Sequence, residues 1–321
     1  MTQKQLTLEK RYEIKAYIQA GFSKTEIAHK IKVHKSTITR ELQRNSGRSG
    51  YYPKAADIKS KQRRQNARKH IKFTQDIQNK VKALLLLDFS PEQISGRLKK
   101  EKDISISHER IYQYLREDQA AGGSLWKSLR HSNKIRKKRN RTERRGHIPD
   151  RVFIDQRPKI VDQRRRIGDW EADTLWKPRG KGGALLTLVE RKTGYTLLTW
   201  LPDRKALRIA ETITTLLSDF KERVHTLTVD NGKEFAEHKM ISANLKTKIY
   251  FAHPYHSWER GTIENTNGLI RQYFPRKIRL DQSVAKQVPF VQQRLNFRPR
   301  KRLNYKTPYE KIFKTSVAFI C

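Results

Sequence analysis

The chain begins with three short stretches in which apolar residues recur at helical spacing. Gly21 ends the first stretch, and the sequence SKTE at 23–26 is a capping box that opens the second. Ile38 and Leu42 lie four positions apart in the third. The apolar positions of the first two stretches are Leu6, Leu8, Tyr12, Ile14, Ile18, Ile27, Ala28 and Ile31. Two short helices joined by a tight turn predict a helix-turn-helix, with an ordinary three-helix bundle as the alternative.

A second helical module is predicted further along the chain. The sequence SPEQ at 90–93 supplies an N-cap, a proline at the first helical position and a glutamine at N3, and Ser107 caps the next helix. This pair resembles another helix-turn-helix, with a plain helical hairpin as the alternative. The outward-facing polar residues of the two modules are Ser36, Thr37, Arg40, Arg44, His108 and Gln113.

From about residue 166 the pattern changes to strands alternating with helices. Strands are predicted over 167–176, 184–190, 195–201, 226–229 and 248–251, and helices over 206–220 and 258–273. The order βββ-α-β-α-β-α predicts an α/β domain with a mixed sheet, in which an antiparallel meander is followed by parallel strands.

These patterns predict five segments. The first helix-turn-helix occupies 1–50 and the second 76–120, and the α/β domain occupies 161–321. Basic linkers are expected over 51–75 and 121–160, because each contains a run rich in Lys and Arg, at 59–72 and 134–145.

The amino-acid composition indicates which kind of molecule the chain binds. The chain has 71 Lys and Arg against 32 Asp and Glu, a net charge of +39, and so basic a chain is expected to bind nucleic acid. The longest aliphatic run, 83–87, is far shorter than the roughly 20 residues of a membrane span, and the N-terminus has no apolar signal segment. A single cysteine, Cys321, excludes an internal disulfide and a cysteine-based zinc cluster. We therefore expect no membrane partner and a reducing cytosol.

Acidic residues gather in this otherwise basic α/β region. Asp169, Glu171 and Asp173 share one face of the first strand because side chains alternate, and spacing does not distinguish among them. A solvent-facing strand edge is the alternative. Asp230 follows the strand at 226–229, at the end where open α/β sheets bind ligands, although Asp-Asn-Gly is also a turn signature.

The helix predicted near residue 261 carries a further acid and a base on one side. Glu264 and Arg271 are seven residues apart, which is about two turns and about 10 Å. A carboxylate beside a metal ion and a cation that holds a neighbouring phosphate fit that geometry, and a solvated helix face is the alternative.

Three strings resemble one family. IGDWEADT, LTVDNGKEF and FAHPYHSWERGTIENTNGLIRQYFPR, with 34 positions between Asp230 and Glu264, are similar to the catalytic strings of the IS30 family of bacterial insertion-sequence transposases. This family is part of the DDE transposase and retroviral integrase superfamily. The resemblance extends from about residue 6 to 313 and includes the N-terminal helix-turn-helix. It implies an all-α N-terminal region followed by an RNase H-like catalytic domain with a mixed five-stranded sheet.

The resemblance also implies the chemistry. Asp173, Asp230 and Glu264 would be the catalytic metal ligands, and Arg271 matches the basic residue that such transposases carry seven positions after the glutamate. Two Mg²⁺ ions about 3.5–4 Å apart, with Mn²⁺ as a substitute, would serve hydrolysis at the element ends and then strand transfer. The partners would be double-stranded DNA, as inverted repeats and target, and a second copy or larger assembly. The expected location is the bacterial cytoplasm, at the nucleoid.

Two other functions remain open from the residues alone. One is a DNA-binding regulator with a structural C-terminal domain, and the other is a metal-dependent nuclease that cuts without strand transfer. The roles of His253 and His256 also stay open, since they could orient DNA or a leaving group, or could be ordinary core or surface histidines.

Overall fold

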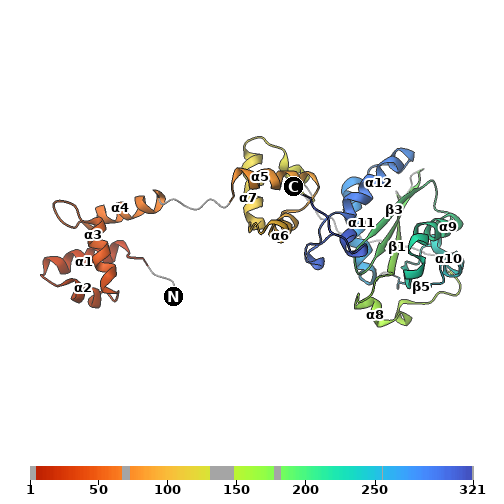
Figure 1. Cartoon of the computed structure of the whole chain (residues 1–321), viewed down its shortest axis with the longest axis horizontal. Helices are drawn as coiled ribbons and strands as arrows, with labels where there is room; N and C mark the ends of the chain where they lie inside the picture. Colours follow the sequence, from red (N-terminus) through yellow and green to blue (C-terminus); the bar gives the residue numbers. More distant parts are fainter. Residues whose placement is uncertain (1–4, 67–72, 131–147, 177–181, 255, 320–321) are drawn as a thin grey trace. The chain divides into compact units, whose positions relative to one another are not determined.

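The computed structural model describes residues 5–66, 73–130, 148–176, 182–254 and 256–319 (Figure 1). The chain divides into two units, Met1–Lys72 and Phe73–Cys321. The basic run at 134–145 lies outside the described residues, so its predicted role as a linker stays a prediction. No helix in the described part of the chain is long and apolar enough to cross a membrane.

The first unit is a small helical domain. It contains α1 (Leu8–Gln19), α2 (Lys24–Lys30), α3 (Lys35–Asn45) and α4 (Pro53–Asn66). The predicted capping box is present, because the Ser23 side chain accepts from the Glu26 N–H and the Glu26 carboxylate accepts from the Ser23 N–H. The buried core consists of Ile14, Ile27, Ala28, Ile31, Ile38, Tyr51 and Ala56.

Helix α4 differs from the sequence expectation, which placed a linker over 51–75. Residues 53–66 form a helix, and two contacts attach it to the preceding helices. Ala56 is fully buried in the core, and Asp57 forms an ion pair with the buried Arg11 at 2.8 Å. Arg11 also pairs with Glu41 at 2.8 Å. The basic residues of this segment therefore lie on a helix packed against the domain.

The second unit starts with α5 (Gln75–Leu86), α6 (Pro91–Lys102) and α7 (His108–Ala120), and the predicted caps at Ser90 and Ser107 are both formed. The C-terminal part of the chain packs on these helices. Phe319 contacts Phe89 edge to face, with ring centroids 5.2 Å apart. Arg97 on α6 forms a two-pronged ion pair with Glu310 of α13 (Pro308–Ile312), at 2.9 and 2.8 Å.

The α/β region contains five strands, β1 (Asp169–Leu175), β2 (Ala184–Glu190), β3 (Thr196–Leu201), β4 (Thr226–Val229) and β5 (Lys248–Phe251). They form one sheet in the order β3-β2-β1-β4-β5. The β1–β2 and β2–β3 pairs are antiparallel, and the β1–β4 and β4–β5 pairs are parallel. The pattern predicted this mixed sheet of an antiparallel meander followed by parallel strands, and its five strands, with β1 at the centre, agree with the fold that the family resemblance implies.

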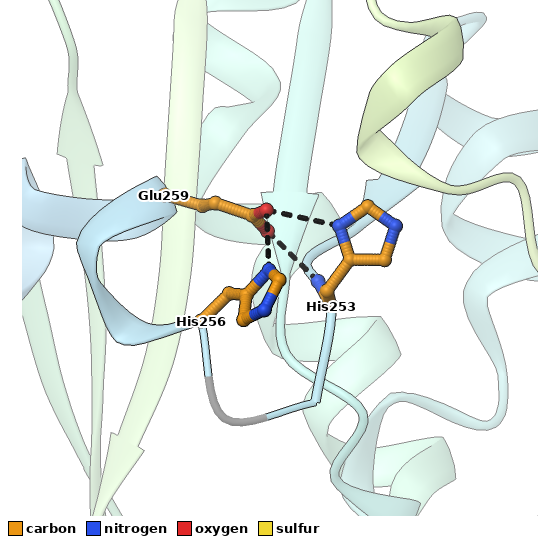
Figure 2. Close-up of side chains that lie close together, drawn as sticks. All are labelled: His253, His256 and Glu259. Atoms are coloured by element: carbon orange, nitrogen blue, oxygen red, sulfur yellow. Dashed lines mark hydrogen bonds and ion pairs between the residues drawn. The ribbon is translucent and has the colours of Figure 1, made fainter.

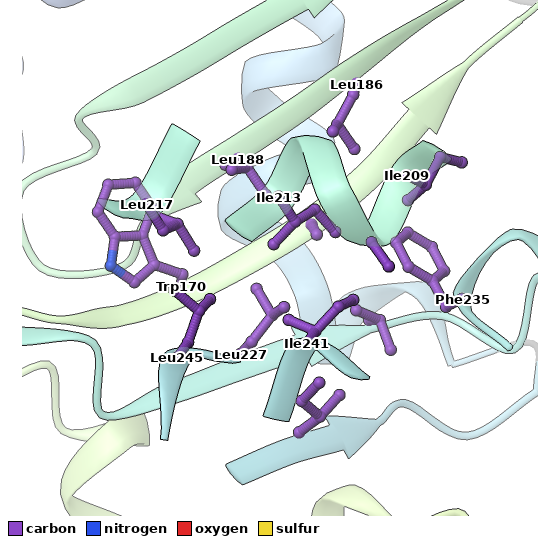
Figure 3. Packing of buried hydrophobic residues seen from close by; sticks show 14 of the residues in the cluster. Trp170, Leu186, Leu188, Ile209, Ile213, Leu217, Leu227, Phe235, Ile241 and Leu245 are labelled. Carbon is purple, nitrogen blue, oxygen red and sulfur yellow. The ribbon is translucent and has the colours of Figure 1, made fainter. Parts of the chain in front are cut away.

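Helices cover both faces of the sheet. One face packs against α9 (Ala206–Leu217) and α10 (His238–Leu245), where Trp170 and Leu227 meet Ile213 and Ile241 (Figure 3). The other face packs against α11 (Gly261–Tyr273) and α12 (Gln282–Asn296). Among the described residues, the other short helices are α8 (Lys159–Asp162) and 3₁₀ turns at Leu125–Ser128, Ile154–Gln156, Ser218–Arg223, Lys233–Phe235, Ser257–Arg260 and Lys301–Leu303.

The alternation along β1 decides what faces α11. Trp170 and Ala172 belong to the core beneath α9 and α10, so Glu171, Asp173 and Leu175 point to the opposite face. Asp169 and Glu171 are buried, 1% and 0% exposed. The alternative of a solvent-facing strand edge is therefore wrong, because β1 is paired on both sides and covered on both faces.

Candidate active site

The first two carboxylates of β1 have structural partners. Arg166 donates two hydrogen bonds to Asp169, both at 3.0 Å, and the Thr226 hydroxyl donates a third at 2.8 Å. Glu171 forms a buried ion pair with Arg191 and accepts the backbone N–H of Ile263 at 2.8 Å. Glu171 therefore fastens the start of α11 to the central strand.

Asp173, the third carboxylate, has a different environment. Its Oδ2 accepts a hydrogen bond from Nδ2 of Asn267 at 2.6 Å, and Nη1 of Arg260 lies 3.7 Å from its Oδ1. Burial raises the pKa of Asp173 to about 6, to which the neighbouring carboxylates of Asp230 and Glu234 also contribute, while Arg260 opposes the rise. A cation near this carboxylate would stabilise its charged form.

Asp230 lies immediately after β4, which is parallel to β1 and beside it. Its Oδ1 accepts the backbone N–H of Gly232 at 2.9 Å, and Nη2 of Arg260 lies 3.7 Å from its Oδ2. One guanidinium is thus 3.7 Å from both Asp173 and Asp230. The structure brings these two aspartates, 57 positions apart in the sequence, to the same end of two neighbouring strands.

Helix α11 presents the remaining candidates along one side. Glu264 is exposed and lies one turn before Asn267, whose side chain contacts Asp173. Arg260 lies four positions before Glu264, at the end of the 3₁₀ turn Ser257–Arg260. Arg271 is two turns beyond Glu264, and it donates weakly to the carbonyls of Phe274 and Trp176, at 3.4 and 3.5 Å. Burial lowers the pKa of Arg271, and the charge of Asp173 opposes that shift.

Comparison with known proteins identifies the family. A family model described as a helix-turn-helix domain matches residues 2–45. The chain is 43% identical to the transposase for insertion sequence element IS4351 of Bacteroides fragilis, over 98% of this chain and 99% of the relative. It is 38% identical to transposase InsI for element IS30A of Escherichia coli (strain K12), over 95% of this chain and 82% of the relative. The chain belongs to the IS30 family of transposases.

A solved structure is also similar to the IS30-family chain described here. The catalytic core domain of BIV integrase matches with a TM-score of 0.37 and 20% identity, over 46% of this chain and 94% of that chain. The family membership inferred from the three sequence strings is confirmed by the relatives.

The IS30-family helix-turn-helix places two of its four candidate DNA contacts fully on the surface. Arg40 and Arg44 are exposed on α3, whereas Ser36 and Thr37 are partly buried near its start. The Ser36 hydroxyl lies 2.8 Å from Nδ1 of His34, the residue that caps α3, so this hydroxyl already has a local partner. In the second module, His108 and Gln113 are exposed on α7. Their contacts with DNA stay predictions.

The donor set at Asp173 and Asp230 fits a hard divalent cation. Mg²⁺ prefers carboxylate oxygens and retains several waters, so a few acids suffice. In the structure a guanidinium already supplies positive charge between these two carboxylates, which indicates a position where a cation is favourable. The structure brings Asp173 and Asp230 together around Arg260. Glu264 is exposed on α11, and its role as a third ligand stays a prediction.

Sequence reasoning missed several polar residues of this site. Arg260 and Asn267 contact the candidate ligands, and Glu234 accepts a hydrogen bond from the Thr174 hydroxyl at 2.8 Å. Arg260 and Asn267 lie within the family string FAHPYHSWERGTIENTNGLIRQYFPR, four positions before and three after Glu264. That spacing was the available signal, because Asn267 lies one helical turn after Glu264 on α11 and Arg260 lies in the 3₁₀ turn immediately before the helix.

Proposed function

We propose that this chain is a DNA transposase that binds the terminal inverted repeats of an insertion element, cleaves the element ends and joins the 3′-hydroxyl strands to target DNA. The observation that supports this most is the pair Asp173 and Asp230, placed around one guanidinium in a chain of net charge +39. Carboxylates repel DNA, so their convergence in a basic protein favours a cation-dependent enzyme over a DNA-binding regulator.

Asp173, Asp230 and Glu264 would hold two Mg²⁺ ions, or Mn²⁺ in their place. Such ions, when bound, stabilise the attacking and leaving oxygens of a phosphodiester and lower the pKa of the attacking water. Asn267 orients the Asp173 carboxylate, and the Gly232 N–H orients that of Asp230. Arg271, seven positions after Glu264 on α11, would bind a neighbouring phosphate.

The helical modules would recognise the element ends, with Ser36, Thr37, Arg40 and Arg44 in the first and His108 and Gln113 in the second. Tandem modules lengthen the DNA site and so raise specificity. Because two ends must reach one target, the active form would be a homodimer or larger assembly. It would act on the bacterial nucleoid in the cytoplasm.

The test is incubation of the full chain with labelled element-end DNA, target DNA and Mg²⁺ or Mn²⁺. We expect strand breaks that leave a 3′-hydroxyl at the element end, followed by a joined product with the target. A nuclease would give breaks without the joined product, and a regulator would give binding alone. Either of these two results would contradict the proposal.

Replacing Arg40 by alanine should weaken binding to element-end DNA by about 1–3 kcal/mol, because a bidentate Arg–guanine contact contributes about this much discrimination. Binding to unrelated DNA should change less. Fluorescence anisotropy with both duplexes measures the difference. Arg48→Ala is the matched control, since Arg48 is an exposed arginine outside α3. Equal losses on the two duplexes would assign Arg40 to phosphate contact only.

Affinity for DNA should fall steeply with salt, because each phosphate neutralised by Lys or Arg releases counterions. If the modules neutralise about six to ten phosphates, affinity falls about 10³–10⁵-fold between about 50 and about 200 mM salt. A titration series over this range gives the slope of log affinity against log salt. A flat slope would contradict the electrostatic basis of binding.

A further inference from the structure

The loop between β5 and α11 brings three potential metal ligands together. Glu259 Oε1 lies 2.9 Å from His253 Nδ1 and 3.1 Å from His256 Nδ1. The ligand atoms of all three residues lie within 4.8 Å of one another (Figure 2). The three residues are close in sequence, at positions 253, 256 and 259.

The imidazole of His253 is held from its other side. Its Nε2 lies 2.9 Å from Oδ2 of Asp155, which belongs to a separate segment of the chain. Its ring stacks on Phe153 with centroids 5.5 Å apart and an angle of 4° between the planes. A carboxylate on the second ring nitrogen is the usual support of a metal-binding histidine, because it fixes the tautomer and the ring orientation.

We propose that His253, His256 and Glu259 bind a divalent transition-metal ion of the zinc class. Two imidazole nitrogens and one carboxylate suit Zn²⁺, Co²⁺ or Ni²⁺, whereas Mg²⁺ takes oxygen ligands. Three protein ligands leave one position for water, as in zinc sites with an open coordination position. His253 and His256 are 29% and 45% exposed, so an ion can enter from solvent.

The position of this site gives it a structural role. Glu259 immediately precedes Arg260, whose guanidinium lies 3.7 Å from Asp173 and from Asp230. Asp155, which supports His253, comes from the 3₁₀ turn Ile154–Gln156. An ion here would fix the start of α11 against that turn and so hold Arg260 in place. The ion itself would be separate from those at Asp173, Asp230 and Glu264.

The alternative to a metal site is a cluster in which His253 and His256 each donate an Nδ1–H hydrogen bond to Glu259. Glu259 also accepts the backbone N–H of His253 at 2.8 Å, so the cluster is ordered in either case. The two alternatives differ in one measurable respect. A metal site requires both Nδ1 atoms to be free of protons and so binds an ion, whereas a hydrogen-bonded cluster binds none.

Titration of the metal-free full chain with Co²⁺, in excess Mg²⁺ and without DNA, tests the proposal. We expect one equivalent to bind, with visible absorption of a four-coordinate ion that Zn²⁺ displaces. His256→Ala and Glu259→Gln should lose this binding. Asp155→Asn should weaken it by about 10–100-fold, as loss of an outer-shell carboxylate does. Zn²⁺ should raise the thermal midpoint of the original chain and leave that of His256→Ala unchanged.

Two controls keep the result interpretable. His225→Ala removes an exposed histidine of the same domain and should bind Co²⁺ normally. Asp230→Asn should also bind it normally, which places the ion outside the acidic site whether or not the proposed catalytic chemistry is correct. Far-UV circular dichroism checks that each variant is folded. Equal Co²⁺ binding by the original chain and by folded His256→Ala, or no binding by either, would overturn the proposal.

Discussion

Asp230→Asn should lose nicking of element-end DNA while its affinity for that DNA stays unchanged. The substitution keeps the shape of the side chain but removes a negative charge from the position where Asp173 and Asp230 meet. An amide is a poor ligand for a hard divalent cation compared with a carboxylate. Loss of several kcal/mol of charge stabilisation in the transition state corresponds to a fall of about 10³-fold or more in cleavage rate.

The measurement is single-turnover nicking of labelled end DNA in Mg²⁺, beside anisotropy binding to the same DNA. Asp219→Asn is the matched control, because Asp219 is an exposed aspartate of the same domain outside the sheet. It should cleave normally. Asp173→Asn should behave like Asp230→Asn. If Asp230→Asn nicks at the original rate, the assignment of the metal ligands is wrong.

Much of the fold could be predicted from the sequence because its signals are local. The strands at 184–190, 226–229 and 248–251 have the predicted bounds, since short apolar runs bounded by turns define buried strands. The capping boxes at Ser23 and Ser90 formed as predicted, because each depends on residues three positions apart. The mixed pattern of an antiparallel meander followed by parallel strands was also predicted, whereas the place of β4 beside β1 is given by the structure.

The arrangement of charges around the site could not be predicted in the same way. Asp169, Glu171 and Asp173 share one face of β1, so the alternation of side chains alone does not show which of them is the candidate metal ligand. What separates them is a partner distant in sequence, Arg191 for Glu171, and Asn267 for Asp173. No local pattern specifies such pairings. The resemblance to a family selected Asp173, and its role as a metal ligand stays a prediction.

The packing of the C-terminal segment on α6 was not predicted either, and it leads to a second large expected effect. Arg97 is 3% exposed, and its guanidinium bonds Glu310, Glu101 and the carbonyl of Tyr305. Arg97→Met should therefore lower the free energy of unfolding of the second unit by about 3–5 kcal/mol, because it leaves a buried carboxylate without its cation. Tryptophan fluorescence during urea unfolding reports this unit, since all five tryptophans lie within it.

Arg116→Met is the control for the loss of a guanidinium. Arg116 pairs with Glu109 at 2.6 Å, but both side chains are more than half exposed. Exposed ion pairs contribute about 0–1 kcal/mol, so this variant should unfold close to the original midpoint. Equal stability of Arg97→Met and Arg116→Met would show that the C-terminal segment is not held by the buried pair.

The pH dependence of unfolding provides an independent check on the same pair. Burial by itself would raise the pKa of Glu310, but hydrogen bonds from Arg97 and from the N–H groups of Thr307 and Val317 lower it to about 2. Because the folded-state pKa lies below the ordinary value of 4.5, the ionised Glu310 carboxylate makes its full contribution to the free energy of unfolding above about pH 4.5. It is lost as the pH falls from there toward about 2. Glu310→Gln should remove this part of the acid sensitivity.

In the Arg97→Met background, Glu310→Gln should recover part of the lost free energy of unfolding, because the uncompensated charge is gone.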